Sequence, residues 1–127
     1  PARAARAGVE INIVEKEALS SGYDLVLTDV PCSGSGSWRR DPQGKWALNE
    51  ARLAEVLHIQ AQILDETAPL LAPKGVLAYV TCSMLRAENE AQVEAFLQRH
   101  PDWTCQQQQR FSPISGADGF FFALLTR

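Results

Sequence analysis

Two cysteines in this sequence follow apolar runs that are typical of buried strands. Cys32 comes just after the run 23–30, Y-D-L-V-L-T-D-V, which carries Asp29 near its end. Cys82 ends a second run, V-L-A-Y-V-T-C. Ligands of open α/β sheets bind outside the carboxyl ends of the strands. If the two strands are neighbours, both thiols face one crevice with the Asp29 carboxylate, where a thiolate acts as a nucleophile and a carboxylate moves protons.

The thiols also have simpler interpretations. A cysteine is often a small buried core residue, and this holds well for either one alone. Two of them at adjacent strand ends, each in a polar Ser, Gly or Thr setting, favour a functional pair. A redox pair is less well supported, because no C-x-x-C motif is present. Cys105 lies away from both strand ends and is expected to pack against the core.

The elements that must position these residues alternate between strands and helices. Asn49 is expected to cap a long helix, and Glu88 and Glu90 to lie in the first turn of a later one. Apolar periodicity predicts helices over 2–7, 49–71 and 88–100, and strands over 10–14, 23–30, 76–82, 103–110 and 120–126. This order predicts one α/β domain over 1–127, with a mostly parallel sheet. The Gly- and Pro-containing segment 31–45 is expected to be a long loop, and its length hints at function.

Composition excludes several classes of protein. The 127 residues include 12 Lys+Arg and 15 Asp+Glu, giving a net charge of -3. This charge excludes a protein that binds nucleic acid through a basic surface over the whole chain. No apolar run approaches the roughly 18 residues of a membrane span. Three cysteines, an odd number, argue against a disulfide framework and predict a cytoplasmic protein. No His/Cys cluster has the spacing of metal ligands, so no metal is expected.

Basic side chains nevertheless gather at one place in this acidic chain. The segment 38–46, W-R-R-D-P-Q-G-K-W, contains Arg39, Arg40 and Lys45, called here the basic cluster. Arg and Lys bind phosphates, and exposed aromatics stack bases. A solvated loop with its tryptophans packed into the core explains the composition equally well. The preceding S-G-S-G-S is a weak candidate for a phosphate cradle, because no P-loop motif accompanies it.

The longer motifs resemble those of a known family. T-D-V-P-C-S-G-S-G-S-W-R-R-D-P-Q-G-K-W is similar to the fourth motif of the Sun/RsmB-type (Nol/Nop/Sun family) RNA cytosine-5 methyltransferases. A-Y-V-T-C-S-M-L-R-A-E-N-E resembles their sixth motif, and D-G-F-F their last. The resemblance implies an incomplete Rossmann-like class I methyltransferase sheet. The chain would be the C-terminal portion of the catalytic domain, without the N-terminal strands and the Gly-rich loop.

The resemblance also implies a reaction and its residues. A methyl group would pass from S-adenosylmethionine to carbon 5 of a cytosine in RNA, with ribosomal RNA as the expected partner. Cys82 would be the nucleophile, and Cys32 would assist release of the product. Asp29 would contact the base or the cofactor, Pro31 would lie on the cofactor side, and Glu17 would contact the adenosine where the family usually has Asp. The basic cluster would hold RNA phosphates beside the crevice.

Three alternatives stay open at this point. A DNA cytosine-5 methyltransferase also uses a Pro-Cys nucleophile, although the second cysteine at Thr-Cys-Ser favours the RNA enzymes. An amino-group methyltransferase would carry Asn/Asp-Pro-Pro-aromatic where this chain has D-V-P-C, and it needs no thiol. A non-catalytic RNA-binding fragment of such an enzyme is the third, because the Gly-rich cofactor motif is absent from the sequence.

One strand edge is expected to be bare. The resemblance places missing strands beside 23–30, and an unpaired edge rich in Val and Leu invites pairing with another chain. Either the strand 10–14 would move in to cover this edge, or a second copy of the chain would do so by self-association.

Overall fold

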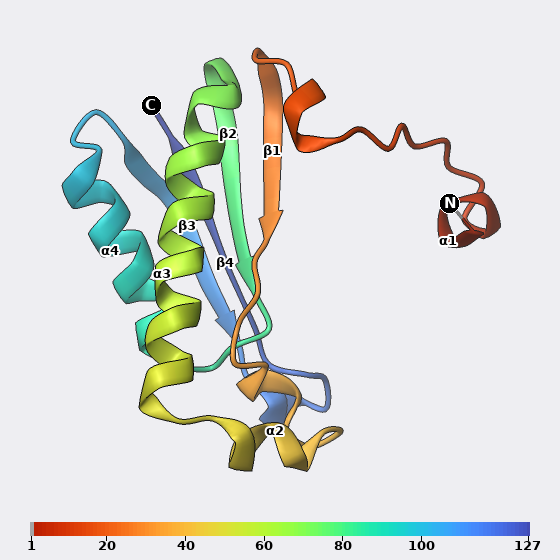
Figure 1. Cartoon of the computed structure of the whole chain (residues 1–127), viewed down its shortest axis with the longest axis vertical. Coiled ribbons are helices and arrows are strands. Elements are labelled where there is room, and N and C mark those ends of the chain that lie inside the picture. Colours follow the sequence, from red (N-terminus) through yellow and green to blue (C-terminus); the bar gives the residue numbers. More distant parts are fainter. Residues whose placement is uncertain (1) are drawn as a thin grey trace.

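The computed structural model describes residues 2–127 and contains one four-stranded sheet (Figure 1). The strands are β1 (Tyr23–Asp29), β2 (Leu71–Thr81), β3 (Thr104–Phe111) and β4 (Phe120–Thr126), in the spatial order β1-β2-β4-β3. β1 is parallel to β2, whereas β4 is antiparallel to both β2 and β3. The α/β class is confirmed, but the expectation of a mostly parallel sheet is wrong, because β3 and β4 form a hairpin whose second strand pairs antiparallel with β2.

The helices α3 (Glu50–Thr67) and α4 (Glu90–Arg99) lie on one face of this sheet (Figure 1). The chain also forms α1 (Ala2–Arg6), which lies away from the sheet, and α2 (Pro42–Ala47), which lies beyond its end. Asn49 caps α3 as predicted, because its side chain accepts a 2.9 Å hydrogen bond from the Arg52 amide. α3 ends before the predicted residue 71, since Pro69 lies in a following 3-10 turn, Ala68–Leu70. No helix among residues 2–127 combines the length and apolar character needed to cross a membrane.

Two local predictions about the first half of the chain were wrong. The segment 31–45 is not loop throughout, because it contains a 3-10 turn and the start of α2, with Pro42 in the first helical turn, where a missing amide costs nothing. The segment 10–14 is not a strand, and Ile11 and Ile13 are 55% and 68% exposed. Apolar alternation forms a strand only where a partner satisfies its backbone, and this segment runs away from β1 (Figure 1).

The hydrophobic core fills the space between the sheet and the helices α3 and α4. Its fully buried side chains include Tyr79 and Phe121 from the sheet and Leu64 and Phe96 from the helices. The opposite face of the sheet carries an apolar groove of about 420 Å³, lined by Leu27, Asp29, Ala78, Val80, Phe120, Phe122 and Leu124. Because β1 and β2 are parallel, their carboxyl ends meet at the same end of the sheet. The loops that follow them form the candidate site.

Candidate active site

The thiols of Cys32 and Cys82 meet beyond the carboxyl ends of β1 and β2. Their Sγ atoms lie 3.3 Å apart, and both side chains are half-buried. The parallel register that pairs Asp29 with Val80 puts the two strand ends side by side. The sequence-based expectation that both cysteines face one crevice is therefore confirmed.

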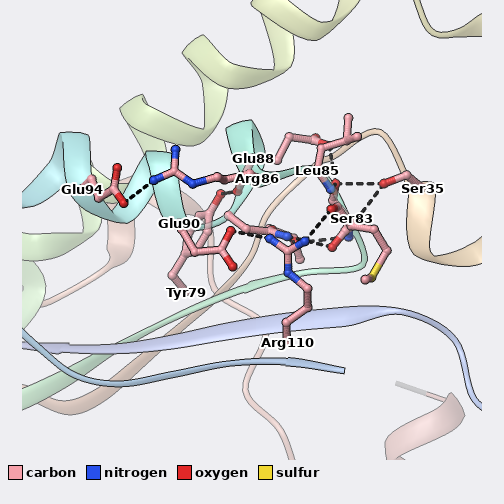
Figure 2. A network of polar contacts seen from close by, with 12 residues as sticks. Ser35, Tyr79, Ser83, Leu85, Arg86, Glu88, Glu90, Glu94 and Arg110 are labelled. Carbon is pink, nitrogen blue, oxygen red and sulfur yellow. Dashed lines mark hydrogen bonds and ion pairs between the residues drawn. The ribbon is translucent and has the colours of Figure 1, made fainter. Parts of the chain in front are cut away.

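A buried carboxylate lies directly behind the thiols. Glu88 is fully buried, and its Oε1 accepts hydrogen bonds from the Ser33 amide at 2.7 Å and from Gln60 Nε2 at 3.1 Å. Its Oε2 accepts from the hydroxyls of Ser33 and Ser83. Ser83 also contacts Ser35, with 3.0 Å between the hydroxyl oxygens, within the network shown in Figure 2. The loop after β1 and the turn after β2 are thus joined through Glu88.

The turn after β2 is held from several sides. The Tyr79 hydroxyl donates to the Glu88 backbone carbonyl at 2.6 Å. Thr81 donates to the Asn89 side chain at 2.6 Å, and the Asn89 amide donates to the Ser83 carbonyl at 2.9 Å. Arg110 of β3 donates to the Met84 carbonyl at 2.9 Å and pairs with Glu90, as Figure 2 shows. These contacts give the segment that carries Cys82 a fixed conformation.

The two thiols differ in their electrostatics. Burial, reinforced by the neighbouring Cys82, raises the pKa of Cys32 to about 12, despite hydrogen bonds from the backbone amides of Gly34 and Cys82. At neutral pH Cys32 is therefore a neutral thiol. Its S–H can donate a hydrogen bond to the Cys82 sulfur, which lies 3.3 Å away. The geometry suits a pair in which Cys82 is the nucleophile and Cys32 is a proton donor.

The residues predicted to bind the cofactor lie apart from one another. Asp29 is exposed and lines the rim of the apolar groove. Pro31 is exposed, and its carbonyl accepts a 2.9 Å hydrogen bond from Gln60. Glu17 lies in the 3-10 turn Lys16–Ala18 that precedes the amino end of β1, the end opposite to Asp29. Pro31 thus directly precedes Cys32, Asp29 ends β1 and lines the groove on the other face of the sheet, and Glu17 lies at the far end of that strand. The three binding roles stay predictions.

The basic cluster lies on the exposed loop and helix that follow Cys32. Arg40 forms an ion pair with Asp118, and Lys45 Nζ lies 5.6 Å from the ring centroid of Trp46. Trp46 is 82% exposed, so it does not pack into the core. This arrangement leaves an aromatic ring and a lysine on the same surface, next to the thiols' loop.

The serine- and glycine-rich loop does not form a phosphate cradle. The Ser33 amide donates to Glu88, and the Gly36 amide donates to the Cys82 carbonyl at 2.9 Å. Amides that would face an anion are already engaged, and a carboxylate lies beneath them. This loop instead packs closely on the turn that carries Cys82.

Sequence reasoning missed the part played by Glu88. It was expected in the first turn of a helix, but α4 begins at Glu90, and Glu88 ends a 3-10 turn, Arg86–Glu88, with its side chain turned inward. Gln60 was also missed, because it lies on the face of α3 that the apolar pattern assigned to the core. The available signal was a polar residue at an otherwise apolar helix position.

Comparison with known proteins assigns the family. The family model described as "16S rRNA methyltransferase RsmB/F" matches residues 6–126. The chain belongs to this family. The Ribosomal RNA small subunit methyltransferase B of Salmonella arizonae is 42% identical over 113 residues, which are 83% of this chain and 26% of that protein. The protein of the same name from Photorhabdus laumondii is 39% identical over 121 residues, 89% of this chain and 28% of that protein.

Solved structures share the fold of this chain. NSun6 from Pyrococcus horikoshii with SFG superimposes with a TM-score of 0.80 at 22% identity, over 98% of this chain and 37% of that one. A methyltransferase homologue from Pyrococcus horikoshii gives 0.78 at 22% identity, over 98% of this chain and 47% of that one. The four strands are thus part of a Rossmann-like methyltransferase sheet. The chain spans about a quarter of the length of the curated RsmB relatives that it matches.

Proposed function

We propose that this chain supplies the two catalytic thiols for transfer of a methyl group to carbon 5 of a cytosine in small-subunit ribosomal RNA. The observation that carries the proposal is the Cys32–Cys82 pair, with 3.3 Å between the sulfur atoms at the ends of two parallel strands. Membership of the RsmB/F family and the names of the curated relatives support methylation of ribosomal RNA. The second thiol favours an RNA enzyme over a DNA cytosine-5 methyltransferase.

The chemistry requires a nucleophile because carbon 5 of cytosine is itself a poor one. Cys82 Sγ adds to carbon 6, and carbon 5 becomes enamine-like and able to accept the methyl group. Carbon 5 then gives its proton to solvent water, and the electrons of that C–H bond restore the double bond between carbons 5 and 6. The bond between Cys82 and carbon 6 breaks with its electrons on the sulfur. Cys32, held as a thiol by its raised pKa, donates its proton to the departing Cys82 sulfur and is afterwards reprotonated from solvent. This division of roles explains why two thiols in contact are of use.

S-adenosylmethionine is the methyl donor that we propose. Asp29 places a carboxylate at the rim of an apolar groove, which suits a ligand with an apolar body and a cationic sulfur. Asp29 and Pro31 would hold it on the crevice side, and Glu17 the adenosine. The solved relative NSun6, crystallised with SFG, an S-adenosylmethionine analogue, supports the same class of cofactor.

RNA is the proposed partner, in the cytoplasm. A base inside a duplex cannot reach thiols at the end of a sheet, so the target cytosine must be unpaired or extruded. The basic cluster follows Cys32 in sequence, and the exposed Trp46 ring beside Lys45 can stack on an unpaired base. Phosphate contacts from these side chains would hold the strand while the cytosine enters the crevice.

The roles of the two thiols are tested by replacing each of them in a full-length methyltransferase that carries this chain. Cys82→Ala should abolish methyl transfer, because no adduct at carbon 6 can form. Cys32→Ala should accumulate a covalent protein–RNA adduct, because release of the Cys82 sulfur stalls. The readouts are incorporation of labelled methyl groups and a band shift in denaturing gels. Cys105→Ala is the matched control and should behave as wild type, since this side chain packs against the core. Near-normal turnover by Cys82→Ala, with adduct lost in Cys32→Ala, would reverse the assignment.

A further inference from the structure

We infer that Glu88 is a positioning residue that fixes the distance between the Cys32 and Cys82 thiols. No role in the reaction proposed above was assigned to this side chain. The contact between the thiols is a property of the structure itself, while the consequence for methylation rests on the proposed function.

The residue that follows each cysteine is hydrogen-bonded to the Glu88 carboxylate. Ser33 directly follows Cys32, and Ser83 directly follows Cys82. Both serine hydroxyls donate to the same carboxylate oxygen, Oε2, and lie 3.2 Å from each other. Each cysteine is therefore one residue away from an attachment to a single atom. Movement of either loop relative to the other would stretch a hydrogen bond to this atom.

The other carboxylate oxygen anchors the assembly to the core. Oε1 accepts from the Ser33 amide at 2.7 Å and from Gln60 of α3 at 3.1 Å. Gln60 also donates to the Pro31 carbonyl at 2.9 Å, so the residue before Cys32 is held by the same helix. Glu88 and Gln60 are both fully buried. Three elements, namely α3, the loop after β1 and the turn after β2, converge on one carboxyl group.

All four groups that contact this carboxyl group are neutral donors. Two substitutions can therefore show whether the hydrogen bonds of this side chain, and not its negative charge, hold the two loops together. Glu88→Gln keeps one acceptor oxygen for the Ser33 amide and Gln60, and its amide can donate to the two hydroxyls, which accept as readily as they donate. Glu88→Ala removes both oxygens, so the half-buried Ser33 amide loses its acceptor and the Gln60 amide keeps only the Pro31 carbonyl. Gln should hold the loops together, and Ala should release them.

The experiment measures the rate at which Cys32 and Cys82 form a disulfide with each other. Glutathione disulfide first forms a mixed disulfide with one cysteine and releases one glutathione. The second cysteine then displaces the other glutathione and closes the Cys32–Cys82 disulfide. The closing step is followed by mass spectrometry after acid quench and alkylation, in a Cys105→Ala background. This readout needs neither RNA nor methyl transfer.

Glu88→Ala should slow the closing step by about tenfold or more, because small displacements of reacting groups have large effects on rate. Glu88→Gln should close within about threefold of wild type on the same reasoning. The matched control is Glu94→Ala, which removes an exposed carboxylate on α4 that pairs with Arg86. A closing rate in Glu88→Ala equal to that of wild type would overturn the proposal.

Circular dichroism establishes that each variant is folded. If Glu88→Ala does not fold, the double variant Ser33→Ala/Ser83→Ala carries the test, because it cuts both attachments to Oε2 and leaves the carboxyl group in place. Closure at the wild-type rate in this variant would equally overturn the proposal.

The consequence for catalysis is measured separately in a full-length methyltransferase that carries this chain. Glu88→Ala should lower kcat with little change in KM for RNA, and Glu88→Gln should restore most of kcat. If closure is slowed but wild type does not methylate RNA, the proposed function fails and the positioning role stands. If wild type methylates RNA and closure is unaffected by Glu88→Ala, the positioning role fails alone.

Discussion

Gly36 shows at the scale of single residues how closely the site is packed. Its amide donates to the Cys82 carbonyl, and its carbonyl accepts from the Gly119 amide, both at 2.9 Å. A Cβ atom at this position would lie 2.7 Å from the Cys82 carbonyl oxygen and still closer to that of Gly119. Both obstacles are backbone atoms, so Gly36→Ala must displace a loop. We expect it to lower the free energy of unfolding by about 1–3 kcal/mol.

Urea denaturation measures this effect on stability. Gly44→Ala is the matched control, because a Cβ there meets side-chain atoms of Trp38 and Asp41 at 3.4 Å, an ordinary contact. Gly44 lies inside α2, so alanine should leave stability unchanged or raise it by up to about 1 kcal/mol. Equal stability of the wild-type and Gly36→Ala proteins would mean that the segments carrying Gly36, Cys82 and Gly119 do not pack as described.

The basic cluster makes a second prediction for individual side chains. Replacing Arg39, Arg40 and Lys45 by Ala should weaken RNA binding by a full-length methyltransferase and reduce the slope of log K against log salt by up to about two, since each phosphate contact with single-stranded RNA contributes about 0.7. Trp46→Ala is the control, because loss of stacking should weaken binding without changing the slope. A slope unaffected by the triple substitution would confine these side chains to structural contacts such as the Arg40–Asp118 pair.

The sequence predicts some of these site residues and not others for a physical reason. The meeting of Cys32 and Cys82 follows from strand order, because residues at the carboxyl ends of neighbouring parallel strands must converge. The position of Glu88 depends on how the turn after β2 folds back under the loop after β1. No local pattern encodes that path, and an acidic residue near the start of a helix has a simpler explanation. The buried carboxylate therefore emerges only with the structure.

At the scale of elements, prediction succeeded where the partner lies within the chain. The strand 120–126 was predicted with the bounds that β4 has, and β4 is paired on both sides by β2 and β3. β4 is a continuous apolar run, whereas the segment 10–14 alternates apolar and polar residues. This segment forms no strand, and among residues 2–127 the edge strand β1 pairs only with β2. Local pattern sets the preference of a segment, and a partner decides whether it becomes a strand.

The free edge of β1 gives a prediction about assembly. Since 10–14 does not cover it, we expect a second copy of the isolated chain to pair there at high concentration, helped by Leu25 and Leu27, which are 59% and 61% exposed. Leu27→Lys should favour the monomer, because a charge on an edge strand opposes pairing. Sedimentation velocity over a concentration series measures the effect. Gln98→Lys, on the exposed side of α4, adds the same charge away from the edge and should still associate. A wild-type chain that stays monomeric throughout would contradict the prediction.

At the scale of the whole molecule, the sheet is covered on one side only. α3 and α4 cover one face (Figure 1), while a groove on the other face is lined by Leu27, Val80 and Phe122. Sheets of the α/β class are ordinarily covered by helices on both faces. The chain spans about a quarter of its curated relatives. The described residues thus hold the two thiols in place, and the groove on the open face of the sheet has only one wall.

This incomplete enclosure predicts weak binding of S-adenosylmethionine by the isolated chain. Small-molecule sites usually bury 70–90% or more of the ligand surface, and a groove on an open sheet face buries far less. Asp29 alone adds an exposed charge, which contributes little in water. Isothermal titration calorimetry of the 127-residue chain should therefore give no saturable heat at micromolar ligand, whereas a full-length methyltransferase carrying the chain should saturate. Micromolar affinity of the chain alone would mean that the groove beside Asp29 is a sufficient cofactor site without a second wall.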